Sequence, residues 1–579
     1  MFRLFRYLKN YKKESIIGPV FKLTEVCFEM IVPLIMANII DVGIKNSDKP
    51  YIYKSGIILV VLGILGLVCA LTAQYYAAKA SNGFGTELRR DLFRHINTLS
   101  YSEIDKLGSH TLVTRMTADI NQAQSGINIL LRFFLRSPFV VIGSTIMAFM
   151  VSARLTIIFL IIAPLLSFVI YKIMSVTIPK YKNIQKTLDR INLMTSEGLS
   201  GARVIRAFSR QRDEEKEFHE NTQKLYSQQI SAGRISALMN PSTFLIVNIA
   251  IVFIVWFGGK SVYSGFVTQG QVIALVNYMN QILYALLQMT ILITSVTKMQ
   301  ASAQRINEIF DVKSSVLDNE KEVYKKLEDA PKIEFRNCSF SYNGNENSLE
   351  NISFKVRQGE TVGIIGATGS GKTTLVNLIP RFYNVSKGKV LVDGIDVKEY
   401  PLSQLRAKIG LVPQNAVLFK GTVRENMQAR CKNCSDDEIW RALEIAQAKE
   451  FIEGKDGQLD YQVSQYGRNF SGGQRQRLTV ARALAGSPEI LILDDSASAL
   501  DLATDVKMRR SIREKTQGST VMIVSQRITS IKECDRILVL DDSRLVGQGT
   551  HEKLYKSCDV YKEICLSQLS EKELQDNEK

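Results

Sequence analysis

The sequence contains neither a secretory signal nor a cysteine framework. Its basic start, residues 1–13, has no short apolar core followed by a small-residue cleavage site. The eight cysteines are scattered, and the one close pair, Cys431 and Cys434, lacks the second pair or the histidines that a zinc site needs. We therefore expect no leader, no zinc site and unpaired cytosolic thiols. The spacing of the basic residues in 1–13 predicts an amphipathic helix on a membrane surface.

The sequence also lacks a concentrated basic strip of the kind that binds nucleic acid. The net charge is +16 and 46% of the residues are hydrophobic, so charge alone permits nucleic acid as a partner. However, the basic residues are spread through the chain, and the first half carries repeated apolar runs. A lipid bilayer is therefore the expected partner, and nucleic acid is not. With 579 residues, the chain is also too long for a single core.

Six apolar runs in residues 1–310 each have about the length of a bilayer span. They are Ile16–Ile40, Gly56–Ala80, Phe133–Val151, Leu155–Ile178, Phe244–Tyr263 and Val272–Val296. Long polar stretches rich in helix formers follow the second and fourth runs, without glycine or proline clusters. The sequence thus predicts an α-helical membrane domain of six spans whose helices continue into the cytoplasm.

The distribution of Lys and Arg predicts the orientation of these spans. Residues 1–13, 79–136 and 172–241 hold 25 of them, against 5 in the connections on the opposite side. Because positive residues favour the cytoplasmic side, the N-terminus and both long extensions are expected there. This predicts a multi-pass protein of the cell membrane.

The second half of the chain has a different pattern. Residues 311–331 are charged and read as a linker. From residue 332 to about 566, short Val, Ile and Leu strands alternate with helical patterns, which is typical of an α/β domain on a largely parallel sheet. The predicted domains are therefore 1–310, the linker 311–331 and 332–579, with a polar tail after residue 569 that is expected to fray.

A phosphate-binding loop is the strongest motif. The segment from Gly366 to Thr373 reads GATGSGKT between an apolar strand and a helical stretch. In such a loop, backbone N–H groups curl around phosphate oxygens, the lysine reaches the terminal phosphates and the next hydroxyl ligates Mg²⁺. The predicted ATP-binding residues of this α/β P-loop domain are Gly366, Thr368, Gly369, Ser370, Gly371, Lys372, Thr373 and Thr374.

A second apolar run, Ile490–Leu493, ends in Asp494. A strand that ends in a carboxylate beside a phosphate loop predicts a ligand for the nucleotide's Mg²⁺. Alone, such a run is an ordinary strand end. The expected cofactors are ATP and Mg²⁺, with Asp494 and Thr373 as metal ligands.

Between these motifs lies the run Ser471-Gly472-Gly473-Gln474. Taken alone, it would be an ordinary helix cap. In its order relative to the phosphate loop it resembles the signature of the ATP-binding cassette family, which binds the ATP held by the opposite subunit. The resemblance implies that Tyr342 stacks on adenine, that Gln414 senses Mg²⁺, and that Ser498 to Asp501 crosses the dimer interface. Six helices before one cassette resemble the exporter branch, which implies coupling helices near Tyr101–Leu107 and Gly198–Ala207.

Two positions depart from the family pattern. Asp495 stands where the family has a glutamate that positions the attacking water, and its carboxylate is one methylene shorter. Gln526 stands where the family has a histidine, and it carries no positive charge. Both fall on the site of Lys372. Gln465, where such exporters often carry glutamate, is a smaller departure.

The departures make the chain resemble the degenerate-site half of bacterial heterodimeric multidrug exporters. The implied partner is a second half-transporter that retains the glutamate and the histidine. The implied function is ATP-driven export of small amphipathic compounds by alternating access, in which this chain lends its signature to the partner's competent site. Two alternatives stay open: a homodimeric lipid or peptide exporter, and a regulatory ATP-binding membrane subunit.

Two acids in the first apolar run are candidates for substrate contact. Glu25 and Glu29 lie four residues apart and so share a helix face. They either attract cationic amphipathic compounds or pair with Lys22, Arg132 or Arg136 as structural fasteners. Because burial in lipid favours pairing, the second reading has the greater weight.

Overall fold

The computed structural model describes residues 2–319, 329–344, 346–497, 499–516 and 518–568. The chain divides into two compact units, the first comprising Met1–Ile96 and His110–Asp311 and the second Asn97–Ser109 and Val312–Lys579. The expected fold class, six membrane helices followed by an α/β nucleotide-binding domain, is confirmed.

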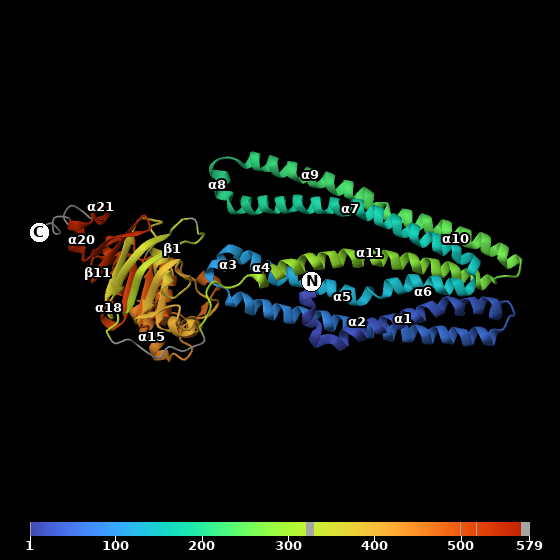
Figure 1. Ribbon diagram of the computed structural model, residues 1–579, viewed down its shortest axis with the longest axis horizontal. Coiled ribbons are helices and arrows are strands. Elements are labelled where there is room, and N and C mark those ends of the chain that lie inside the picture. The colour runs from blue at the N-terminus through green and yellow to red at the C-terminus, as the bar shows by residue number, and fades with distance from the viewer. Residues whose placement is uncertain (1, 320–328, 345, 498, 517, 569–579) are drawn as a thin grey trace. The chain divides into compact units, whose positions relative to one another are not determined.

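The first unit is entirely helical in its described residues (Figure 1). Its elements are η1 (Phe2–Tyr11), α1 (Lys12–Asn38), η2 (Ile39–Ile44), α2 (Lys49–Thr98), α4 (Ser109–Thr114), η3 (Arg115–Asp119), α5 (Ile120–Phe133), α6 (Arg136–Val151), α7 (Ala153–Ser200), α8 (Ala202–Ala207), α9 (Gln211–Ala237), α10 (Met239–Tyr263) and α11 (Gln269–Asp311). Within the described residues, six segments are long and apolar enough to cross a membrane: Arg3–Ile44, Lys49–Thr98, Ser109–Val151, Ala153–Ser200, Gln211–Tyr263 and Gln269–Asp311.

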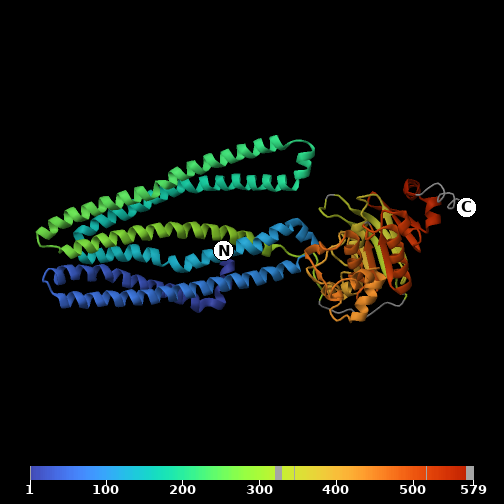
Figure 2. The same ribbon diagram turned by 180° about the vertical axis from the view of Figure 1, so that it is seen from behind.

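The polar stretches continue these helices beyond a bilayer's thickness. α2 contains 50 residues, which at 1.5 Å per residue is about 75 Å, against about 30 Å of hydrocarbon. α7 and α9 also run beside each other as a long pair of helices, as Figures 1 and 2 both show. Strong helix formers without glycine or proline clusters account for this continuity.

The last helix of the first unit, α11, is held by polar contacts from its neighbours. The Tyr278 hydroxyl donates to the Met30 carbonyl of α1 over 2.7 Å, and Tyr278 is fully buried. Nearer its end, Arg305 pairs with the buried carboxylate of Asp119, which also accepts from Arg115 at 3.0 Å. Because Asp119 is buried, its charge needs these arginine partners, so the contact with Arg305 favours the observed packing of α11.

The second unit contains two main sheets. Its elements are α3 (Tyr101–Leu107), β1 (Ile333–Phe340), β2 (Leu349–Val356), β3 (Thr361–Gly366), α12 (Lys372–Leu378), β4 (Lys387–Val392), β5 (Ile395–Asp396), α13 (Leu402–Ala407), β6 (Ile409–Val412), β7 (Gly421–Thr422), α14 (Val423–Gln428), α15 (Asp436–Ile445), α16 (Lys449–Glu453), η4 (Gln458–Asp460), β8 (Gln462–Val463), η5 (Gln465–Gly467), α17 (Gly472–Leu484), β9 (Ile490–Asp494), α18 (Leu502–Lys515), β10 (Thr520–Val524), α19 (Ile528–Ile531), β11 (Arg536–Asp541), β12 (Arg544–Gly549), α20 (His551–Ser557) and α21 (Asp559–Gln568).

The larger sheet positions the functional residues. Its strand order is β12-β11-β3-β10-β9-β6, and all neighbours are parallel except β11 and β12. β9 is buried along its whole length, as expected of a strand covered on both faces. Because β3, β9 and β10 run in the same direction, their carboxyl ends meet at one edge, where ligands of α/β sheets bind. The smaller sheet, β2-β1-β4-β5, is antiparallel.

Candidate functional site

A cavity of about 350 Å³ lies at the carboxyl ends of β3, β9 and β10. It is lined by Tyr342, Ser348, Thr368, Gly369, Gly371, Lys372, Thr373, Thr374, Gln414, Asp494, Asp495, Val524, Ser525 and Gln526. Most of the residues predicted to bind ATP and Mg²⁺ therefore line one cavity. Of the predicted phosphate-loop residues, Gly366 and Ser370 do not line the cavity, because Gly366 ends β3 and Ser370 is buried beneath the loop.

The loop between β3 and α12 takes its shape from its glycines. Gly371 has a φ of +95° and caps α12, and a Cβ there would lie 2.5 Å from the Ser348 carbonyl oxygen. Only glycine fits such a position without strain. The Ser370 hydroxyl is buried and has no hydrogen-bond partner among the described residues. A loop of this form, which leads into a helix N-terminus and holds an unpaired hydroxyl, fits a bound phosphate group.

Lys372 lies against the loop that precedes it. Its Nζ donates to the carbonyl oxygens of Gly366 and Ala367, at 2.9 and 2.7 Å. Burial lowers the pKa of this ammonium, although the carboxylates of Asp495 and Asp494 act in the opposite direction. A phosphate group nearby would add negative charge and favour the charged lysine.

An oxygen pair at the end of β9 fits a divalent cation. The Thr373 hydroxyl donates to the Asp494 carboxylate over 3.1 Å, and Asp494 is buried. Burial raises the pKa of Asp494, while the bond from Thr373 acts to lower it. A hydroxyl and a carboxylate beside a phosphate are oxygen ligands of the kind that Mg²⁺ prefers.

Asp495 lies on a strained turn directly after β9. Its φ is +48°, in the left-handed region, and its N–H donates to the Val524 carbonyl at 3.0 Å. Burial raises the pKa of its carboxyl group, against the lowering effects of Arg527 and of a hydrogen bond from Gln414. Asp495, Gln414 and Gln526 all line the cavity that contains Lys372.

The predicted signature segment lies outside this cavity. Ser471 is the N-cap of α17: its hydroxyl accepts from the Gln474 N–H at 3.3 Å, and its own N–H donates to the Gln474 side chain at 3.1 Å. This reciprocal pair is a capping box, which explains the choice of serine and glutamine locally. Ser471 and Gly472 are exposed. The first turn of α17 therefore offers free N–H groups to a ligand from outside this pocket.

Comparison with known proteins identifies the family. The chain matches the model of the ABC transporter transmembrane region over residues 15–286 and the ABC transporter model over residues 349–498. It is 36% identical over 569 residues to an uncharacterized ABC transporter ATP-binding protein of Mycobacterium tuberculosis (strain CDC 1551 / Oshkosh), with 97% of each chain covered. The chain belongs to the ABC transporter family.

Two further comparisons describe this transporter. It is 32% identical over 468 residues to the ATP-dependent lipid A-core flippase of Syntrophus aciditrophicus (strain SB), covering 81% of this chain and 78% of that protein. Its fold matches the structure of a bacterial Atm1-family ABC exporter with ATP bound, with a TM-score of 0.81 and 21% identity, over 97% and 100% of the two chains. With one membrane domain and one ATP-binding domain, the chain is a half-transporter with the exporter fold, and it couples ATP to transport.

Two other predicted residues of the transporter are Tyr342, which lines the cavity, and Asp501, which precedes α18. Tyr342 is partly exposed, its hydroxyl is 3.1 Å from that of Thr374, and its ring packs edge-on against Tyr383 at 5.2 Å. Asp501 caps α18 by accepting from the Thr504 N–H at 3.0 Å, and this bond lowers its pKa. Ser498, predicted to belong to the same interface segment, lies outside the described residues.

The segment α3 packs on the cassette within the second unit. The Tyr101 ring lies 4.5 Å from the Phe382 ring, and the Tyr383 hydroxyl donates to the Asp105 carboxylate at 2.8 Å. Burial, followed by the Asp105 contact, raises the pKa of Tyr383. Tyr383 thus contacts both Tyr342 and α3, a connection that sequence analysis missed because it named no cassette residue opposite Tyr101–Leu107.

Two glutamines that sequence analysis did not single out brace the cavity. Gln476 of α17 is buried; its side chain donates to the Asp495 carbonyl at 3.3 Å and accepts from the Ala499 N–H at 3.1 Å. Gln568, the last residue of α21, contacts the backbone at Gln526 and Ile528. No local sequence pattern at either glutamine predicts these hydrogen bonds to distant backbone groups.

Both acids predicted in the first apolar run are paired. Lys22 contacts the Glu25 carboxylate at 2.6 Å, and Arg136 contacts the Glu29 carboxylate at 2.9 Å. The Glu25 side chain is 10% exposed, against 43% for Glu29. Arg136 also donates to the Gln288 side chain at 2.6 Å. Both carboxylates thus form the ion pairs expected of structural fasteners. Of the two, Glu29 is the one with an exposed side chain.

The prediction that all cysteines are unpaired is wrong for one pair. Cys431 and Cys434 form a disulfide, with Cα atoms 5.5 Å apart, because a turn after α14 brings them together and the Cys434 N–H donates to the Cys431 carbonyl. The other six cysteines are free.

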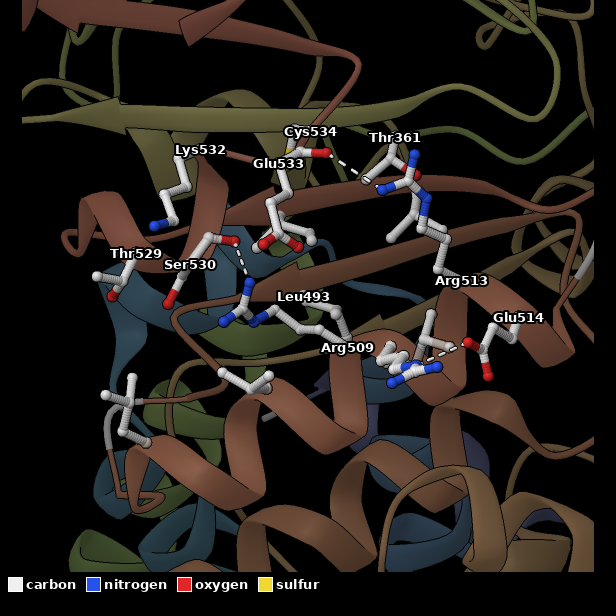
Figure 3. Close-up of a pocket in the computed structure, with 16 residues that line it drawn as sticks. Thr361, Leu493, Arg509, Arg513, Glu514, Thr529, Ser530, Lys532, Glu533 and Cys534 are labelled. Carbon is white, nitrogen blue, oxygen red and sulfur yellow. Dashed lines mark hydrogen bonds and ion pairs between the residues drawn. The ribbon is translucent and has the colours of Figure 1, made fainter. Parts of the chain in front are cut away.

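A second cavity, of about 610 Å³, lies between α18, α19 and β10 (Figure 3), and none of the predicted site residues lines it. Its three arginines already have partners. Arg509 donates to the Ser530 carbonyl, Arg510 pairs with Glu514, and Arg513 donates to the Glu533 carbonyl. Each of these arginines thus already makes a contact within the cassette.

Proposed function

We propose that this transporter is the degenerate-site half of a heterodimeric exporter of drugs or other small amphipathic compounds. The observation that carries the proposal is that Asp495 and Gln526 line the same cavity as Lys372. Both substitutions therefore act on one ATP site, whereas the helix cap formed by Ser471 and Gln474 is complete.

In the pocket, the loop N–H groups and Lys372 hold the phosphates of ATP, and Tyr342 stacks on adenine. Thr373, Asp494 and Gln414 hold Mg²⁺, which neutralises charge on the phosphates. Asp495 is too short to position water, and a misplacement of about 1 Å can lower the rate about a hundredfold. Gln526 offers the γ-phosphate a hydrogen bond without a positive charge. The pocket therefore binds ATP and hydrolyses it slowly.

The signature segment serves the other site. Ser471 to Gln474, at the start of α17, contacts the ATP held by a partner half-transporter that has the usual glutamate and histidine. Asp501 lies at the interface between the two cassettes. ATP stabilises the closed pair of cassettes more than the open pair, which is what drives alternating access. ATP retained at the degenerate site keeps the cassettes partly closed between cycles.

The exporter lies in the cell membrane with its N-terminus and cassette in the cytoplasm, as the excess of Lys and Arg on that side supports. In the membrane domain, Glu29 is the acid available to a substrate, because its side chain is the more exposed. Glu25 is a fastener for Lys22. In Glu29→Gln, stimulation of ATP hydrolysis by cationic amphipathic compounds should fall, and the unfolding temperature should fall less than in Glu25→Gln because Arg136 keeps its hydrogen bond to Gln288. The reverse result would exchange these roles.

The decisive experiment measures Mg²⁺-dependent ATP hydrolysis by the purified chain, alone and with a candidate partner half-transporter, together with ATP binding. We expect binding with little hydrolysis by the chain alone and rapid hydrolysis by the pair. Rapid hydrolysis by the chain alone would overturn the proposal.

A second candidate is a homodimeric lipid exporter, which is favoured by the similarity to a protein named lipid A-core flippase. It predicts rapid hydrolysis by the chain alone and stimulation by lipid. A regulatory subunit that moves no substrate is the third; it predicts that export persists when this chain is deleted.

A further inference from the structure

The end of α21 holds the segment that carries Gln526. The Gln568 side chain donates through Nε2 to the Gln526 carbonyl oxygen at 2.8 Å. Its Oε1 accepts from the Ile528 N–H at 3.0 Å. One amide side chain thus makes two hydrogen bonds to the backbone on either side of Arg527.

The helix that presents this amide is anchored in the cassette core. Tyr561 and Cys565 of α21 are both fully buried, in the same cluster as Ile528 and Ile531 of α19. The Tyr561 hydroxyl also lies 2.7 Å from His551 Nδ1. Gln568 is one turn beyond Cys565, so the position of its amide is tied to a packed helix rather than to an exposed loop.

The segment it holds is short and has few other contacts. Only Ser525, Gln526 and Arg527 separate β10 from α19. The Ser525 N–H donates to the Ile364 carbonyl at 3.1 Å, and the Arg527 N–H donates to the Ser525 hydroxyl at 3.0 Å. For the carbonyl of Gln526, the described residues supply the Gln568 amide as hydrogen-bond donor. This backbone sets the direction of the Gln526 Cα–Cβ bond, from which the side chain extends toward the pocket that it lines.

We propose that Gln568 is a positioning residue for the γ-phosphate end of the ATP pocket. By fixing the backbone from Gln526 to Ile528, it keeps the Gln526 side chain directed at the terminal phosphate. The proposal rests on the role of Gln526 proposed above. It assigns α21, the last helix that the structure describes, to the discrimination between ATP and ADP, although no residue of α21 lines the pocket.

The test compares the affinities of the full-length chain for ATP and for ADP, in detergent with Mg²⁺. Gln568→Ala should weaken the hydrogen bond from Gln526 to the γ-phosphate. Loss of that one bond should raise the Kd for ATP about fivefold and leave the Kd for ADP unchanged. ADP is the internal reference, because it lacks the phosphate that Gln526 faces. Equal weakening of both nucleotides would mean a merely structural role and would overturn the proposal.

Two further variants sharpen this measurement. Ser567→Ala is the matched control: Ser567 is the exposed neighbour of Gln568, and its hydroxyl donates only within α21, to the Ile564 carbonyl. It should leave both affinities unchanged. Gln568→Glu keeps an acceptor for the Ile528 N–H but cannot donate to the Gln526 carbonyl, so it should lower the preference for ATP as Gln568→Ala does. Full ATP preference in Gln568→Glu would contradict the proposed bond to Gln526.

A double-mutant cycle separates this inference from the function on which it rests. If Gln568 acts through Gln526, then Gln526→Ala and the double variant should lose the same ATP preference. A change in Gln526→Ala with none in Gln568→Ala would overturn the inference alone. An unchanged preference in Gln526→Ala would overturn the proposed role of Gln526, and the inference with it.

Discussion

The phosphate pocket and the signature segment of this cassette both use the N-terminus of a helix, but they differ in the side chains around it. At α12, the cap is Gly371, and the surrounding side chains include Asp495 and Gln526. At α17, the cap is Ser471, which forms a capping box with Gln474. The backbone groups that attract phosphate are thus present at both places, and the proposed loss of groups needed for hydrolysis concerns the pocket alone. The proposed function thus separates ATP binding from ATP hydrolysis within one domain.

The largest expected effect comes from damaging the intact region. Gly472→Glu places a carboxylate at the first position of α17, where the helix dipole tolerates it, but where it repels the partner's γ-phosphate. We expect ATP turnover by the pair of half-transporters to fall about a hundredfold. Gly472→Ala is the control, because its Cβ would lie 3.7 Å from the Ala499 Cβ, an ordinary contact. Unchanged turnover in Gly472→Glu would show that the segment faces no phosphate.

Giving the pocket the family's glutamate and histidine should remove the difference in side chains between the pocket and the signature segment. In Asp495→Glu with Gln526→His, the longer carboxylate reaches the water and the imidazole can carry charge. Hydrolysis by the chain alone should rise by at least about tenfold. Asp494→Glu, which lengthens the neighbouring carboxylate by the same methylene, should give no increase. A gain in both variants would point to a general effect of carboxylate length.

A comparison of two similar helix caps tests whether Ser471 acts in ATP turnover as well as in capping α17. Ser435 forms a capping box with Glu438 at the start of α15, as Ser471 does with Gln474. Either Ser→Ala change should lower the free energy of unfolding by about 1 kcal/mol. Only Ser471→Ala should lower turnover by the pair, about fivefold, because its cap faces the partner's ATP. Equal turnover in the two variants would reduce Ser471 to a structural role.

The smallest effect is expected from reducing the disulfide near the other end of α17. A Cβ on Gly486 would lie 3.1 Å from that of Cys431, so the disulfide packs where α17 ends. Closing a four-residue loop is worth about 2 kcal/mol, so dithiothreitol should lower the unfolding temperature by a few degrees. Turnover should change less than twofold, and ATP binding by the pocket should not change. The Cys431→Ser/Cys434→Ser variant should not respond to dithiothreitol; a wild-type chain that also ignores it would contradict the disulfide.

The sequence predicts most of the pocket because its motifs are local. Glycines in a phosphate loop and a carboxylate after a buried strand can be read without knowing what lies opposite them. The contacts of Gln476, Gln568 and Tyr383 could not be predicted this way, since each depends on which distant backbone or side chain the fold brings near. The Cys431–Cys434 pair was missed for another reason: spacing alone does not distinguish a disulfide from two free thiols.

The docking of α3 onto the cassette has a consequence for synthesis. Asp105 and its partner Tyr383 are 278 residues apart in the chain. At about 5 to 20 residues per second, a ribosome finishes Asp105 on the order of 15 to 55 seconds before Tyr383. During that interval, Tyr101 has no cassette to pack against, while the membrane helices after it are made. The order of translation thus leaves α3 without its cassette partners until Tyr383 has been made.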